Sequence, residues 1–175
     1  MSTDQFVCRA CGGVHSGPPL SFAAPAPDFW QPEMTGDEAC LLDSDLCVIA
    51  GEQFFVRGLI ELPIWGTEES FTWSMWVSLS RPNFTRAVDV WEQPGRETEP
   101  PCFGWLSNAI AGYEPSTLNL RTNVHTRPVG QLPYIELEPT DHPLAVEQRN
   151  GISMARVEEI ASFHLHNLSE HLPGR

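Results

Sequence analysis

Residues 45–80 read DLCVIAGEQFFVRGLIELPIWGTEESFTWSMWVSLS and carry the densest apolar and aromatic content of the chain. The middle segment, residues 53–62, is apolar on both faces apart from Arg57 and Glu61, as expected of a central strand covered on both sides. Turn residues separate the segments. The last segment alternates apolar and polar side chains, which is typical of a half-buried strand. The stretch therefore predicts a central three-stranded meander. The apolar face of its last strand comprises Phe71, Trp73, Met75, Val77 and Leu79.

Two further strands are predicted after the meander. Residues 117–126 and 134–138 alternate in the same way, and we expect them to pair. Such pairing would set carboxylates near Arg121 or Arg127. Cross-strand opposite charges contribute only about 0.2–1 kcal/mol each. The favoured interpretation is therefore a solvated ion-pair face, with a binding surface as the alternative.

Two helices are predicted from apolar residues at helical spacing, in residues 83–91 and 153–170. The first follows Ser80-Arg81-Pro82, a typical start with serine as cap and proline in the first turn. The second has an apolar face that we expect to pack against the sheet, and this face includes Val157, Ile160, Ala161 and Leu165. Glu158 and Glu159 lie early in this helix and His166 lies late, as the helix dipole favours. Weaker patterns predict short helices in residues 33–44 with Asp37 as cap, around residues 106–110 in the ambiguous stretch 102–113, and in residues 141–151 with Asp141 as cap.

These elements define the predicted fold class. We expect one α+β domain over residues 1–175, because the length suits a single domain with a substantial core. Its mostly antiparallel sheet would contain about five strands, covered by two or three helices, with an N-terminal CxxC zinc knuckle.

Charge and composition narrow the classes of partner and compartment. The formal charge is −13, and all ten basic residues are arginine. Such an acidic surface repels phosphate backbones and anionic lipid, so we expect neither nucleic acids nor membranes as partners. An unidentified protein partner remains possible. The N-terminus lacks a basic segment followed by an apolar core. These features favour a soluble protein of the cytoplasm.

The strongest chemical signal is FVCRACGGVH at residues 6–15. Cys8 and Cys11 are two residues apart and precede two glycines, which let backbone amides turn toward the sulfurs of a metal-binding knuckle. An odd total of five cysteines suits a reducing compartment with a metal site better than a disulfide framework. Structural zinc is therefore favoured over a redox pair or a site without cofactor.

A closed zinc site needs four protein ligands. Cys8 and Cys11 supply two, and His15 is close enough in sequence to supply a third. We expect Cys47 to be the fourth, because it opens the first strand of the meander and would tie the N-terminal segment to the sheet. His142 is the alternative fourth ligand.

A second cluster contains Glu138, Asp141 and His142, which we expect to converge at one end of the sheet. A histidine beside carboxylates at a helix start could act as a general base or bind a catalytic metal. In the structural interpretation, which is favoured, Asp141 caps the helix and His142 is a hydrogen-bonded turn residue. His164, on an apolar helical face, is interpreted as a core histidine.

Several motifs together resemble a bacterial family, domain of unknown function 2199. They are CRACGGVH, LDSDLCVIAGEQFFVRGLIELPI, WVSLS, FGWLSN and LEPTDHPLAVEQRNGI, and the resemblance covers residues 6–166. It implies a stand-alone bacterial domain without an established activity. Cys40 and Cys102 lie outside the matched motifs and are not expected to be ligands. The matched motifs contain Cys8, Cys11, His15, Cys47 and His142.

The sequence thus favours a zinc-stabilised, acidic domain that acts as an interaction or regulatory module. A hydrolase centred on His142, dependent on a metal or on a histidine and carboxylates, is the alternative. A thiol redox sensor that uses Cys8 and Cys11 is a third possibility. The sequence leaves open whether the chain is an enzyme.

Overall fold

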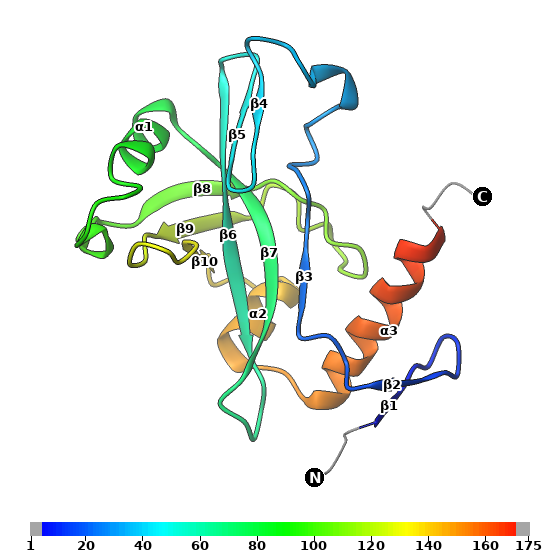
Figure 1. Ribbon diagram of the computed structural model, residues 1–175. Helices are drawn as coiled ribbons and strands as arrows, with labels where there is room; N and C mark the ends of the chain where they lie inside the picture. The colour runs from blue at the N-terminus through cyan, green and yellow to red at the C-terminus, as the bar shows by residue number, and fades with distance from the viewer. Residues whose placement is uncertain (1–4, 171–175) are drawn as a thin grey trace.

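A computed structural model describes residues 5–170, with side chains described up to residue 166 (Figure 1). A small hairpin near the N-terminus precedes a main sheet of eight strands. The hairpin strands are β1 (Gln5–Val7) and β2 (Val14–Ser16). The main sheet contains β3 (Ser21–Ala23), β4 (Leu41–Leu42), β5 (Leu46–Ile49), β6 (Gln53–Pro63), β7 (Ser70–Leu79), β8 (Cys102–Leu106), β9 (Arg121–His125) and β10 (Tyr134–Leu137). The helices are α1 (Arg81–Asp89), α2 (Pro143–Asn150) and α3 (Met154–Glu170), with short 3-10 helices η1 (Pro32–Met34) and η2 (Arg96–Thr98).

The predicted meander is confirmed. β5, β6 and β7 pair antiparallel in sequence order, and β6 and β7 stay paired from Phe54↔Leu79 to Pro63↔Ser70. In Figure 1 these two strands form the longest ribbon of the sheet. The alternation along β7 turns its apolar face into the main core, as the sequence pattern indicates. The expectation of cover on both sides holds for the first part of β6, where three consecutive residues are buried.

The sheet closes on itself, which the sequence did not predict. The order β7–β8–β9–β10–β6 ends with a direct pairing of β6 and β7, so these five strands form a closed ring of mixed direction. β10 joins β6 in parallel at Tyr134↔Leu59. β5 and β4 extend the sheet beyond β6, and β3 pairs in parallel with β7. The fold is therefore α+β, with a closed five-stranded sheet, additional strands and three α-helices.

Two glycines make this tight closure possible. A Cβ atom on Gly104 of β8 would overlap the side chain of Val77 and lie 2.8 Å from the carbonyl oxygen of Ser78. A Cβ atom on Gly58 of β6 would lie 2.8 Å from a side-chain carbon of Ile135 on β10. Neighbouring strands approach too closely at both points for any larger residue.

The helices cover the main core at separate places. Phe84 of α1 packs on Phe54 of β6, with ring centroids 5.1 Å apart. α1 starts as predicted, because the Ser80 side chain accepts a hydrogen bond from the amide of Asn83. α2 and α3 also contribute to the main core. Figure 1 shows α2 at the lower part of β6, with α3 following it in the chain. Their buried apolar residues there are Leu144, Ala145, Val157 and Ile160.

The predicted pairing of the two later strands is confirmed. β9 and β10 pair antiparallel over four residues. Arg121 Nε lies 2.9 Å from a carboxylate oxygen of Glu138, and both side chains are largely exposed. Arg127 instead pairs with Glu61 of β6 at 2.7 Å.

Three local predictions were wrong. Residues 33–44 form no α-helix, because the Asp37 carboxylate accepts a hydrogen bond from the amide of Ala39 in a turn. Residues 106–110 form no helix: strand β8 ends at Leu106, and residues 107–110 have no regular secondary structure. The cap of α2 is His142, not Asp141.

No helix within residues 5–170 has the length and apolar character needed to cross a membrane.

Candidate metal centre

The hairpin loop between β1 and β2 has the geometry of a metal-binding knuckle. The Cys8 amide donates to the carbonyl of Gly13 at 2.9 Å, and the Gly12 amide donates to the carbonyl of Cys8 at 2.8 Å. Gly12 has a φ of 69°, in the left-handed region that favours glycine. The Gly13 amide donates to the Cys11 sulfur at 3.3 Å. The two glycines thus turn the backbone around the sulfurs, as the sequence predicts.

The hairpin docks on α3. Phe6 and Cys8 are buried against Ala161, and Leu165 packs on the same small cluster. The Arg9 amide donates to the hydroxyl of Ser162 at 3.3 Å. Figure 1 shows the hairpin beside α3, away from the closed ring of strands. This docking brings the CxxC motif to the side of a helix near the other end of the described chain.

Cys8, Cys11 and His166 form a group that could hold a metal ion. Their ligand atoms all lie within 4.8 Å of one another. The Cys8 sulfur and His166 Nε2 are 3.1 Å apart, although the two residues are separated by 158 positions in the sequence. Cys8 is buried, His166 is partly buried and Cys11 is exposed. Two thiolates and an imidazole form a donor set that suits zinc.

The surroundings of Cys8 favour its thiolate form, which is the form that binds metals. A hydrogen bond from the backbone amide of Cys11 is the largest cause that lowers the pKa of the Cys8 thiol to about 6, against burial, which raises it. Further hydrogen bonds involving Ala10 and His166 lower the pKa in the same direction. Because the thiolate is the ligand and the nucleophile, Cys8 is prepared to bind a cation at neutral pH.

His15 lies beside this group without being part of it. Its Nε2 atom is 3.9 Å from the Cys11 sulfur, and its ring lies 6.0 Å from the ring of Phe6 between centroids. The expectation that His15 lies close to the knuckle cysteines therefore holds for Cys11. His15 is exposed on β2, so its side chain has room to change rotamer.

The structure does not bring Cys47 to Cys8 and Cys11. Cys47 lies on β5, fully buried in a separate apolar cluster with Ile49, Phe55 and Trp76. Burial raises the pKa of its thiol to about 12, so the side chain stays neutral. The sequence argument placed Cys47 correctly on the first meander strand, but the alternation of that strand turns its sulfur into the core.

His166 was missed as a metal-binding candidate. Its position late in a helical pattern gave only a helix-dipole argument, and no local spacing links it to residues 8 and 11. The CxxC motif signals an incomplete site and therefore a distant ligand. Which distant residue completes the site depends on how the hairpin docks on α3, and this docking has no signature in the sequence.

The predicted polar cluster does not form a shared site. Glu138 faces Arg121 on the outer surface of the sheet, and Asp141 is exposed. His142 is only 8 % exposed. Its Nδ1 atom accepts a hydrogen bond from the Leu144 amide at 3.1 Å, and its Nε2 atom donates to the Pro115 carbonyl at 2.7 Å. With both ring nitrogens engaged by the backbone, the geometry favours the structural interpretation of His142 over the catalytic one.

Comparisons with known proteins identify a family but no function. A family model described as "Uncharacterized protein conserved in bacteria (DUF2199)" matches residues 7–152. No curated protein and no solved structure matches the chain. The matched region contains Cys8 and Cys11 and ends before α3, so His166 lies outside it.

Proposed function

This chain belongs to the DUF2199 family, whose description carries no activity, and on that premise we propose that it is a zinc-stabilised binding domain. In this proposal the ion is structural. It joins the N-terminal hairpin to α3 through Cys8, Cys11 and His166. The observation that carries the proposal is the 3.1 Å approach of the Cys8 sulfur to His166 Nε2 across 158 positions of sequence.

His15 is the proposed fourth ligand. Zn–S distances of about 2.3 Å and Zn–N distances of about 2.1 Å at tetrahedral angles separate a sulfur from a nitrogen by roughly 3.6 Å. His15 Nε2 is 3.9 Å from the Cys11 sulfur but is not in the group whose ligand atoms all lie within 4.8 Å of one another, so its exposed side chain would have to rotate toward Cys8 and His166 to complete the site. Four protein ligands characterise structural zinc, whereas catalytic zinc keeps one position open for water.

The acidic surface indicates which chemical class of partner the domain would bind. A formal charge of −13 favours partners that present basic groups and disfavours nucleic acids and anionic membranes. A zinc ion bound by Cys8, Cys11 and His166 would fix the hairpin and α3 relative to each other. Rigid elements present binding groups more reproducibly than mobile ones, which suits a binding domain.

The test is the metal content of protein purified without an affinity tag. We expect one zinc ion per chain in the parent protein. Cys8→Ala and His166→Ala should each weaken zinc binding by more than about a hundredfold, because even the outer partners of metal ligands contribute about 10–100-fold. Both variants should also melt at a lower temperature, since metal binding contributes directly to folding stability.

Three further variants define the ligand set. Cys47→Ala should keep its zinc, because Cys47 lies in a different cluster. His15→Ala should weaken zinc binding if His15 closes the site. His171, outside the described residues, follows His166 at a spacing common among paired zinc-binding histidines, so His171→Ala is the competing arm. Full zinc affinity in His15→Ala with loss in His171→Ala would overturn His15 as the fourth ligand. A parent protein without zinc, or unchanged affinity in His166→Ala, would overturn the site.

A further inference from the structure

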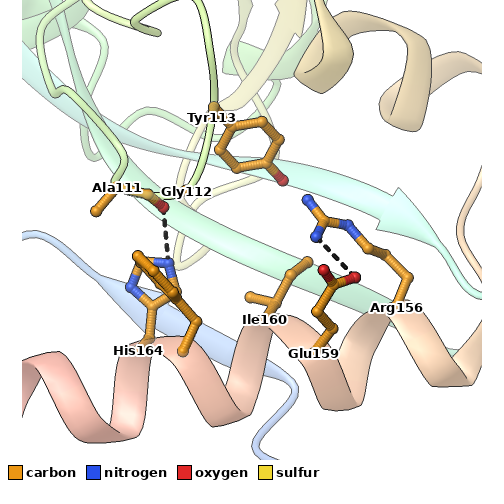
Figure 2. Close-up of a pocket in the computed structure, with 8 residues that line it drawn as sticks. Ala111, Gly112, Tyr113, Arg156, Glu159, Ile160 and His164 are labelled. Atoms are coloured by element: carbon orange, nitrogen blue, oxygen red, sulfur yellow. Dashed lines mark hydrogen bonds and ion pairs between the residues drawn. The ribbon is translucent and has the colours of Figure 1, made fainter.

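A cavity of about 260 Å³ lies between α3 and the loop at residues 111–113 (Figure 2). It is separate from the metal group, because its α3 residues lie earlier along the helix than His166. Apolar side chains form its floor and one wall, and a chain of charged groups stands at one end. Pockets that combine apolar walls with a few convergent polar groups are the usual form of small-molecule sites.

The charged end of the cavity is held by a network of hydrogen bonds. The Tyr113 hydroxyl donates to one carboxylate oxygen of Glu147 at 2.6 Å, and Arg156 Nε donates to the other at 2.7 Å. Burial is the largest cause that raises the pKa of Tyr113, so the hydroxyl remains protonated and remains a donor. Arg156 also lies over the Tyr113 ring, 5.6 Å from its centroid. Glu147 therefore has both oxygens engaged and fixes the guanidinium in place.

Two bonding positions remain at this end of the cavity. Arg156 Nη1 contacts one oxygen of Glu159 at 3.1 Å, as Figure 2 shows. Among the described side chains, which end at residue 166, no hydrogen-bond partner is found for Arg156 Nη2 or for the second oxygen of Glu159. The Glu159 side chain is 60 % exposed, so it can adjust to a ligand, whereas the Arg156 side chain is only 27 % exposed. The Arg156 guanidinium and the Glu159 carboxylate thus lie side by side, and each has an atom that can still form a hydrogen bond.

The rest of the cavity is apolar and shaped by particular contacts. Ile160 is buried, and Phe163 is partly exposed at the rim. A Cβ atom on Gly112 would lie 3.5 Å from the Phe163 ring, so the glycine lets the loop approach this wall closely. At the far end, His164 Nε2 donates to the carbonyl of Ala111 at 3.1 Å, and Figure 2 shows this bond between α3 and the loop.

We infer that this cavity binds a free α-amino acid with an apolar side chain. The carboxylate of such a ligand pairs with Arg156, its ammonium group pairs with Glu159, and its side chain packs on Ile160 and Phe163. A zwitterion can use both of the remaining bonding positions, on Arg156 and on Glu159, whereas a ligand with one charge can use only one of them. Each charge-assisted hydrogen bond that a ligand cannot make lowers its affinity.

The test is calorimetric titration of the full-length protein, as purified, with L-phenylalanine. We expect saturable binding of one ligand per chain. 2-Phenylethylamine, which lacks the carboxylate, and 3-phenylpropionate, which lacks the ammonium group, should each bind at least about tenfold more weakly, because each loses a charge-assisted hydrogen bond. Zinc content measured in the same samples separates this result from the metal proposal, on which it does not depend.

Matched variants locate the site. Glu159→Gln removes the charge that meets the ammonium group and should weaken binding of L-phenylalanine by about tenfold or more. Glu158→Gln makes the same change one position earlier on α3, outside the cavity, and should leave binding unchanged. The inference would be overturned if no saturable binding were detected up to about 10 mM ligand, because a Kd above this concentration is too weak for specific recognition. Equal or tighter binding of either single-charge analogue, or equal effects of the two variants, would also overturn it.

Discussion

His142 joins two segments of the chain through its two ring nitrogens. Nδ1 caps α2, and Nε2 donates to the carbonyl of Pro115 in the loop before β9. His142→Ala should therefore remove a helix cap and leave a buried carbonyl without its partner. We expect a loss of about 1–3 kcal/mol in the free energy of unfolding, measured by denaturant titration.

The neighbouring residue provides the control for this change. Asp141 is exposed, and the cap of α2 does not involve it, so Asp141→Ala should change the stability by less than about 0.5 kcal/mol. Zinc content should be the same in both variants. If His142→Ala lost its zinc while keeping its stability, His142 would be a ligand and not a cap.

At the scale of elements, α3 contacts two different parts of the molecule. Val157 and Ile160 face the main core, whereas Ala161 and Leu165 face the hairpin. The sequence pattern placed all four on one stripe against the sheet, and for Ala161 and Leu165 this was wrong. A helical stripe indicates which side chains turn inward, but it does not specify which element receives them.

Leu165→Asp should accordingly weaken the docking of the hairpin. A carboxylate in this partly buried cluster has Phe6 and Ala161 as neighbours, and we expect a loss of about 1–3 kcal/mol. Weaker zinc binding should accompany the loss, because Cys8 belongs to the same cluster. Glu159→Gln, on the exposed part of α3, is the control and should leave the melting temperature nearly unchanged. A Leu165→Asp variant with parental melting temperature and zinc affinity would contradict this docking.

Strand β8 depends on a glycine to complete the ring. In Gly104→Ala, the added methyl group would overlap Val77 and press on the carbonyl of Ser78. Overpacking of this kind costs about 1–3 kcal/mol, and more where backbone must move. Calorimetric unfolding of the purified variant measures the effect. Parental stability would mean that β7 and β8 lie farther apart than described.

Regular patterns made some elements predictable from the sequence and left others hidden. The alternation in residues 70–79 and the Ser80-Arg81-Pro82 start are local signals, and both gave the correct element. β8 is short, contains Gly104 and carries no clear alternation, so its sequence resembles a loop or a helix as much as a strand. Its conformation is set by β7 and β9, which lie on either side of it. The same limit applies to the site, because the Cys8–Cys11 spacing is local and the position of His166 is not.

At the scale of the whole molecule, the group of Cys8, Cys11 and His166 lies where the peripheral hairpin meets α3, apart from the closed ring of strands. The hairpin contacts described for it involve α3, whereas β6 and β7 are paired with each other and buried in the main core. Removal of zinc by a chelator should therefore loosen the hairpin locally. Amide hydrogen exchange should become faster in β1, β2 and the facing part of α3 and stay slow in β6 and β7. Uniformly faster exchange in all these elements would show that the ion supports the whole fold.

The distance in sequence between Cys8 and His166 has a consequence for the kinetics of folding. Closing a loop of 158 positions carries a larger entropic penalty than closing the shorter loops between paired strands, so we expect this contact to form after the rate-limiting step. An interaction that is absent from the transition state slows unfolding and leaves the folding rate unchanged. Stopped-flow measurements with and without zinc should therefore differ in the unfolding limb alone. The ion would then set how long the native molecule persists, and the closed sheet would set how fast it forms.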